Sequence, residues 1–191
     1  EFRRVLFRSH RGHTLISWSL AGPTGSRLIE KGSPPMEARI AAMRKCQEAG
    51  YTVRARLSPI CPLADWRREG TQLVEALFAS VRPDCITLDV LGWMNARQML
   101  AAMDVSLFEG RFREFVQELA KETPGPHRKH LFPHEWRVEI LRHYLDEIRR
   151  VSPETPVAIC METEEMWAEM GPDLGMCPEE YVCCCGPRSV P

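Results

Sequence analysis

The sequence predicts an α/β fold in which mainly parallel strands alternate with helices. Segments rich in β-branched and aromatic residues alternate with segments whose apolar residues recur at helical spacing. The chain has 191 residues, of which 44% are hydrophobic and 27% are charged, so it is long enough to bury the core of one compact domain. Such alternation joins parallel strands by right-handed crossovers. Helices then cover the sheet, or the sheet curves into a barrel.

The first part of the chain contains two predicted strands around one helix. Residues 13–20 form the first strand, and residues 21–35 form a loop with three Gly and three Pro. A helix is predicted over 36–49 because Met36, Ile40 and Met43 recur at helical spacing, and Gly50 is a suitable residue to end it. Residues 51–57 form the second strand, which we expect to end at Ser58-Pro59.

The second part of the chain repeats this alternation. Leu73, Leu77 and Val81 form one stripe of a predicted helix over 67–81, and residues 85–90 form the third strand. The remaining predicted elements are helices over 96–103, 108–121, 133–150 and 164–170 and a short buried strand over 156–161. Thr163 is the expected N-cap of the last helix. Residues 122–130 and the tail from Gly171 are expected to be irregular.

Charge and hydropathy exclude two classes of protein. The formal net charge of -1 argues against a polybasic nucleic-acid arm, although a local basic face stays open. The longest apolar runs are too short to span a bilayer, so no membrane association is expected. No secretory signal is visible, and the eight cysteines favour a reducing, cytoplasmic location over a disulfide scaffold.

The two ends of the chain differ from the rest. Residues 1–9 lack an initiator Met, and Glu-Phe and Leu-Phe-Arg-Ser can be encoded by a common cloning site and by the end of a sequencing adaptor. We interpret these residues as a remnant of cloning or sequencing. The alternative is an ordinary amphipathic segment. Cys177, Cys183, Cys184 and Cys185 crowd the other end. An unstructured end, a redox-active tail and a metal site are the three interpretations of this cluster.

Three ordered blocks resemble the spore photoproduct lyase family of radical S-adenosylmethionine enzymes. They are Ile16-Ser17-Trp18-Ser19-Leu20 with Glu30-Lys31-Gly32-Ser33, the helix from Glu37-Ala38-Arg39-Ile40 to Ala49-Gly50-Tyr51, and Ser58-Pro59-Ile60 with Trp66. Arg137 and Cys160-Met161-Glu162-Thr163 are similar to the family's C-terminal part. The resemblance covers residues from about 13 to about 167. It implies the later half of a partial (β/α) barrel over residues 10–170, followed by an irregular Cys-rich tail over 171–191.

The resemblance also implies a function and its cofactors. It implies S-adenosylmethionine as cofactor, a [4Fe-4S] cluster in the intact protein, damaged DNA as partner and radical-based repair of a thymine-dimer lesion. The family's cluster signature, C-x-x-x-C-x-x-C, is absent from this chain, so the resemblance places it in a missing N-terminal half of the barrel. The fragment alone is then expected to be inactive. The alternative is a non-catalytic half-barrel fragment or an interaction module that requires a partner.

Active sites in such folds lie at the carboxyl ends of the strands, which directs attention to Ser17, Ser19, Ser58 and Pro59 and to residues after Val90. Ser19 is the leading candidate for contact with the ribose of the cofactor, and Ser17 shares its strand face. Both serines could instead cap the following loop. Ser58 could meet the adenine or merely end its strand.

Arg39 and several aromatic and histidine residues are further candidates. Arg39 either pairs with a carboxylate and organises the loop that holds Glu30, or is a solvated helical arginine. His127, His130 and His134 lie close together in a Pro/Gly-bearing segment, which favours a flexible basic loop over a metal site; phosphate contact is the minor alternative. Trp66 and Trp93 are expected core residues that could also stack on a base.

Overall fold

A computed structural model of the chain describes residues 14–122 and 128–186. Its main sheet has four parallel strands in the order β1-β2-β3-β6, and a second sheet pairs β4 with β5 in antiparallel fashion. The strands are β1 (Leu15–Leu20), β2 (Thr52–Ile60), β3 (Ile86–Val90), β4 (Gly92–Met94), β5 (Arg128–His130) and β6 (Val157–Ile159). The α/β class and the parallel pairing of the four main strands, both predicted from the sequence, are thus confirmed.

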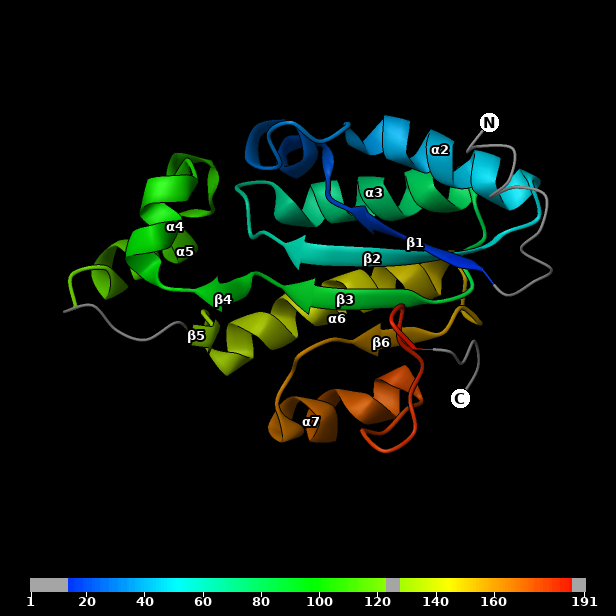
Figure 1. The fold of residues 1–191 in the computed structure, drawn as a ribbon. Helices are drawn as coiled ribbons and strands as arrows, with labels where there is room; N and C mark the ends of the chain where they lie inside the picture. The colour runs from blue at the N-terminus through cyan, green and yellow to red at the C-terminus, as the bar shows by residue number, and fades with distance from the viewer. Residues whose placement is uncertain (1–13, 123–127, 187–191) are drawn as a thin grey trace.

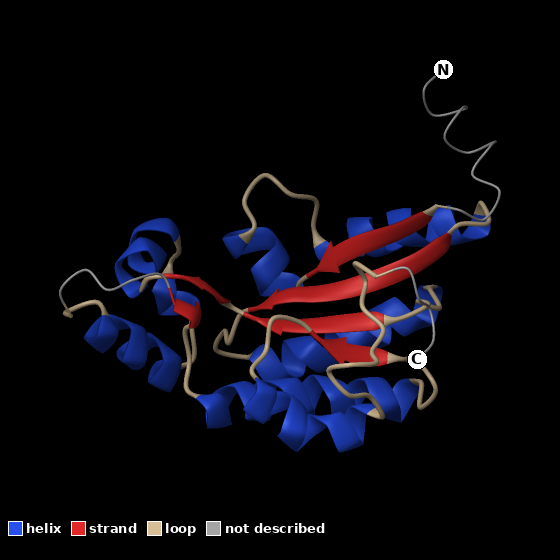
Figure 2. Ribbon diagram, turned by 60° about the horizontal axis from the view of Figure 1, so that its bottom comes forward, coloured by secondary structure: helices blue, strands red, loops and turns tan. Residues whose placement is uncertain are grey.

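The helices lie mainly on one face of the main sheet. They are η1 (Gly25–Ile29), α2 (Met36–Glu48), α3 (Trp66–Ser80), α4 (Ala96–Ala102), η2 (Val105–Leu107), α5 (Gly110–Leu119), α6 (His134–Val151) and α7 (Glu164–Leu174). Figures 1 and 2 show α2, α3 and α6 along this face, while α4, α5 and the β4–β5 pair form a lobe beyond the carboxyl ends of β2 and β3. No helix within residues 14–122 and 128–186 has the length and apolar character needed to cross a membrane.

Alternation along the central strands separates an apolar face from a polar one. Val53, Ala55 and Leu57 of β2 are at most 1% exposed, and so are Ile86 and Leu88 of β3. These side chains alternate with polar ones that point to the opposite side of the sheet. We call that opposite side the inner face; its polar residues are Ser17, Ser19, Arg54, Arg56, Ser58, Thr87 and Asp89. The helix-covered face therefore forms the core. On the inner face, Ser17 and Ser19 are exposed, whereas Arg54 and Thr87 are fully buried.

Two predicted boundaries are wrong. β2 does not stop before Ser58-Pro59 but runs to Ile60, which pairs with Val90 after a shift in register. Pro59 lacks an amide hydrogen, so it interrupts the ladder without ending the strand. Helix α7 does not end at Met170 but continues to Leu174, because Met170 and Leu174 both stay buried. Gly175, with a φ of 68°, provides the left-handed residue that ends it.

Three short elements were not predicted from the sequence. The π-helical turn η1 lies inside the predicted loop over 21–35, and β4 and β5 are only three residues each. The N-cap prediction for α7 is confirmed, since the Thr163 side chain accepts a hydrogen bond of 3.1 Å from the amide of Met166. Gly50, with a φ of 88°, follows the end of α2 as predicted.

The contact between α3 and α6 depends on a glycine. A Cβ atom placed on Gly70 would lie 2.9 Å from Cζ of Tyr144, whose ring is buried. The two helices can approach this closely only because position 70 has no side chain.

We therefore expect Gly70→Ala to lower the free energy of unfolding by about 1–3 kcal/mol through overpacking. Gly110→Ala is the matched control, because its Cβ would meet nothing closer than Arg113 at 3.9 Å. That control should be neutral or stabilising, since alanine is the better helix former. Urea denaturation measures both, and equal midpoints for the two variants would contradict the packing argument.

Candidate functional site

The inner face gathers polar side chains from three neighbouring strands. Ser17 lies beside Arg54 and Ser19 beside Arg56 in the register of β1 with β2, and Arg56 lies beside Thr87 in the register of β2 with β3. Ser17 and Ser19 are both exposed. Two of the sequence-predicted site residues therefore share one accessible surface, as strand alternation predicted.

Ser58 is also on this face, and it is already engaged. Its hydroxyl donates a hydrogen bond of 2.8 Å to Oδ2 of Asp89. Burial raises the pKa of Asp89, while the Ser58 hydroxyl and the Arg56 cation act in the opposite direction. Because its proton is committed to Asp89, Ser58 can offer a ligand only its acceptor lone pairs.

Arg56 is the cation at the centre of the inner face. Its Nη1 lies 3.7 Å from Sγ of Cys185, and its Nε is buried without a hydrogen-bond partner among the residues that the structure describes. Arg56 forms no ion pair with a carboxylate in residues 14–122 and 128–186, although its charge acts to lower the pKa of Asp89. Arg56 therefore keeps donor capacity for an anionic or carbonyl group.

A hollow adjoins this face beyond the end of β6. It has a volume of about 330 Å³ and is lined in part by Cys160, Met161, Glu162, Tyr181 and Cys183. That volume suits a small molecule. On the helix side, by contrast, the ends of β1 and β2 close over a cavity of about 20 Å³, enough for one water molecule. Of these two spaces, only the hollow beside the inner face is large enough for a ligand.

Arg39 lies behind the candidate surface rather than on it. This side chain of α2 is 8% exposed; its Nε donates 2.6 Å to the carbonyl of Pro34 and its Nη1 donates 3.2 Å to the carbonyl of Ser19. It also forms an ion pair with Glu30. The solvated alternative is therefore wrong, and Arg39 holds the backbone of Ser19 while it organises the loop that contains Glu30.

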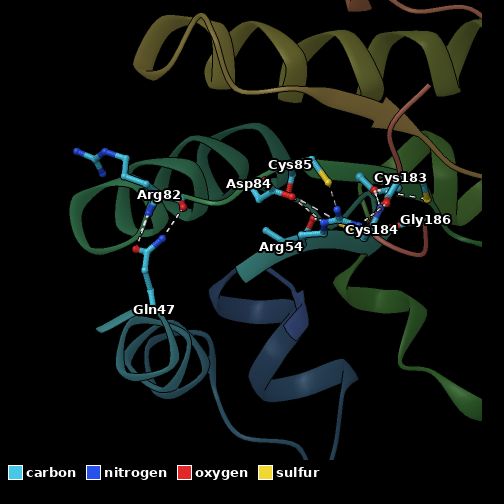
Figure 3. Close-up of polar contacts among 10 residues, drawn as sticks. Gln47, Arg54, Arg82, Asp84, Cys85, Cys183, Cys184 and Gly186 are labelled. Carbon is cyan, nitrogen blue, oxygen red and sulfur yellow. Dashed lines mark hydrogen bonds and ion pairs between the residues drawn. The ribbon is translucent and has the colours of Figure 1, made fainter. Parts of the chain in front are cut away.

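The Cys-rich tail crosses the inner face instead of extending freely up to Gly186. Figure 3 shows Cys183, Cys184 and Gly186 against Arg54 and Cys85. Arg54 is fully buried, bonds Asp84 at 2.8 Å and donates 3.1 Å to the carbonyl of Cys183. The unstructured interpretation fails for this part of the tail.

A buried ion pair joins two residues that the resemblance had singled out. Arg137 of α6 and Glu162 after β6 are paired, with side-chain exposures of 6% and 3%. Arg137 Nη1 also lies 3.1 Å from Nδ1 of His130. Since a guanidinium can only donate, that ring nitrogen must accept, which requires a neutral imidazole. In agreement, burial and the charges of Arg137 and Lys129 lower the pKa of His130 to about 4.

The remaining aromatic and histidine candidates differ in exposure and in their contacts. The core prediction is confirmed for Trp66, which is 2% exposed and donates to Glu109, so it cannot stack on a base. The same prediction is wrong for Trp93, which is 54% exposed. His134 contacts Glu169, and His127 lies outside the described residues. No group of three or more potential ligands suited to a metal ion occurs in residues 14–122 and 128–186.

Sequence reasoning missed Arg56, Asp89 and the fold-back of the tail. Two of these had a readable signal: Arg54, Arg56 and Ser58 alternate with buried apolar residues in β2, and Thr87 and Asp89 do the same in β3. Such alternation places polar groups on one sheet face. The position of the tail had no local signal, because it depends on contacts across more than 90 residues.

The depressed pKa of His130 makes stability depend on pH. As the pH falls from about 6.5 to about 4, the unfolded chain takes up this proton before the folded one, so the free energy of unfolding should fall. His130→Gln, which keeps an acceptor for Arg137, should show a smaller decrease over this window. Urea midpoints at several pH values test this, and parallel curves for the two proteins would contradict it.

Comparisons with known proteins support the fold. No family model and no curated protein sequence matches the chain. Among solved structures, a cysteine-to-serine variant of spore photoproduct lyase matches with a TM-score of 0.58 and 16% identity, over 82% of this chain and 47% of that one. The lyase complexed with dinucleoside spore photoproduct gives 0.57 and 15% over the same shares.

A double variant of that lyase with bound AdoMet and dinucleoside spore photoproduct gives a TM-score of 0.52 and 16% identity, over 81% of this chain and 46% of that one. The chain thus spans about half the length of the structures it matches. At this identity the similarity establishes the fold alone: the four-stranded parallel sheet and its helices correspond to part of the spore photoproduct lyase structure.

Proposed function

We propose that this chain is the C-terminal portion of a cytoplasmic radical S-adenosylmethionine enzyme that resembles spore photoproduct lyase and repairs a thymine-dimer lesion in DNA. The observation that carries the proposal is the accessible inner face, where Ser17 and Ser19 project from a strand whose fold matches the lyase. Fold alone does not define function, so the argument depends on this surface.

The inner face fits S-adenosylmethionine. Ser19 and Ser17 offer hydroxyls that both donate and accept, as the ribose diol requires. Arg39 acts indirectly, because it fixes the carbonyl of Ser19 and so orients the end of β1. Ser58 and Asp89 form an acceptor pair further across the face. When bound, the cofactor would supply the radical chemistry, and these residues would hold and orient it.

The cysteines of this chain do not fit an iron–sulfur cluster. No three of the eight have the C-x-x-x-C-x-x-C spacing. The described residues also provide no set of three His, Cys, Asp or Glu side chains suited to a metal. In this proposal the cluster ligands come from outside the chain.

Damaged DNA is the proposed partner, because a matching structure of the lyase binds a dinucleoside spore photoproduct. Arg56, a half-exposed cation of the inner face, is the group in this region suited to an anionic backbone or a base carbonyl.

The competing proposal is a non-catalytic half-barrel that requires a partner. β1 ends the sheet order and pairs only with β2 in the part of the chain described, so one strand edge is available for pairing. Sequencing the intact gene upstream of the codon for Leu15 separates the two. A C-x-x-x-C-x-x-C motif there supports the enzyme, and a start codon with no cysteine triad contradicts it.

We expect Ser19→Ala to weaken the binding of S-adenosylmethionine by about 5- to 150-fold, because a buried ligand hydroxyl would lose one partner. Isothermal titration of the reconstituted full-length enzyme with the cofactor, alongside its iron content, measures the dissociation constant and shows whether the cluster is still assembled. Unchanged affinity would remove Ser19 from the site and leave Ser17 as the candidate.

The control must be a serine with no role in the fold. Ser26 is unsuitable because it is 1% exposed and its Oγ accepts 3.1 Å from the amide of Met36. Ser80 ends α3 and is exposed, so Ser80→Ala should bind the cofactor as the wild type does. A similar loss in both variants would indicate a general change in folding.

A further inference from the structure

Two cysteines 99 positions apart lie side by side where the tail crosses the inner face. Sγ of Cys85 lies 3.9 Å from Sγ of Cys184, and the two residues are 1% and 8% exposed. Cys85 immediately precedes β3, and Cys184 lies in the tail that crosses the inner face. Figure 3 shows the two side chains pointing toward each other.

The backbone on both sides of Cys184 is held in place. Its amide donates 3.0 Å to Oγ1 of Thr87, and its thiol donates 3.0 Å to the carbonyl of Ala55. Arg54, fully buried and paired with Asp84, donates to the carbonyls of Cys183 and Gly186. These contacts fix the tail over β2 and β3, so the approach of the two thiols is not an accident of one side-chain rotamer.

The pair suits a covalent bond better than a metal. The described residues bring no third ligand to these sulfurs in a metal-binding arrangement. A disulfide needs the sulfurs at about 2.05 Å, and side-chain torsions can bring neighbouring thiols together when the cysteines already face each other.

We propose that Cys85 and Cys184 are a redox modification site, oxidised to a disulfide by a low-molecular-weight disulfide such as oxidised glutathione. The Cys184 thiolate attacks one sulfur of the small disulfide, which releases one thiol and leaves a mixed disulfide on Cys184. The Cys85 thiol, on losing its proton, attacks the sulfur of Cys184 and releases the second thiol. Two protein thiols and one small disulfide thus become one protein disulfide and two small thiols.

The surroundings of Cys184 favour this order of attack. The hydrogen bond from Cys85, aided by the hydroxyls of Thr87 and Ser17, lowers the pKa of Cys184 to about 7 against the opposing effect of burial. A larger thiolate fraction makes Cys184 the attacking residue and Cys85 the resolving one. Access of the small disulfide to Cys184 requires the hydrogen bonds that hold the tail to open transiently by local unfolding.

The disulfide would lock the tail onto the sheet. Ser17 is among the neighbours of Cys184, so the locked tail would cover that end of the inner face. The inference concerns the position of the tail and does not depend on which ligand the inner face binds.

The test treats the reduced chain with oxidised glutathione, removes excess reagent and measures intact mass. We expect the loss of two hydrogen atoms relative to the reduced chain and, in non-reducing peptide mapping, a crosslink between Cys85 and Cys184. Dithiothreitol should reverse it. The oxidised chain should also resist proteolysis after Tyr181 at least several-fold longer than the reduced chain.

Variants identify the pair. Cys85→Ser and Cys184→Ser should each abolish the crosslink, whereas Cys177→Ser, which removes an exposed tail cysteine, should retain it. A wild-type crosslink between Cys160 and Cys183, or stable glutathione adducts without any crosslink, would overturn the proposal. The wild-type map decides the question even if a variant fails to fold.

Discussion

The one-sided burial of the parallel sheet determines where everything else in this structure lies. Helices α2, α3 and α6 cover the face that carries Val53, Leu57 and Leu88, and this apolar layer forms the core. Because side chains alternate along a strand, the residues between these must project to the other side. The inner face is therefore polar, and its side chains can be substituted without changing the packing of the apolar core.

Three buried arginines then attach irregular segments to this frame. Arg39 holds the loop after β1 through the carbonyl of Pro34, Arg137 holds the segment before α6 through the carbonyl of Phe132, and Arg54 holds the tail through the carbonyl of Cys183. Each also pairs with a carboxylate, in Glu30, Glu162 and Asp84 respectively. A guanidinium has five donors in a fixed plane, so it can pair with one carboxylate and also donate hydrogen bonds to backbone carbonyls of irregular segments. Removing either partner of such a pair leaves an uncompensated buried charge.

This arrangement explains how a chain that matches half of a larger enzyme structure can be internally ordered. The core contacts among β1, β2, β3, α2, α3 and α6 are all made within the chain. What the chain presents outward is the edge of β1 and the polar inner face. The proposed cofactor and DNA would bind to the inner face, and further strands would pair with the edge of β1; the tail occupies part of the inner face in this structure.

Periodicity and strand alternation are local properties, so the sequence predicted the α/β class, the four parallel strands, the shared face of Ser17 and Ser19 and the burial of Trp66. For Arg39 it left two roles open, and only the structure selected the organiser of the loop that contains Glu30. The fold-back of Cys184 onto Cys85 and the pairing of Arg137 with Glu162 also became visible only in the tertiary structure. These contacts join segments that local pattern does not connect, and their formation depends on which face of the sheet the helices leave open.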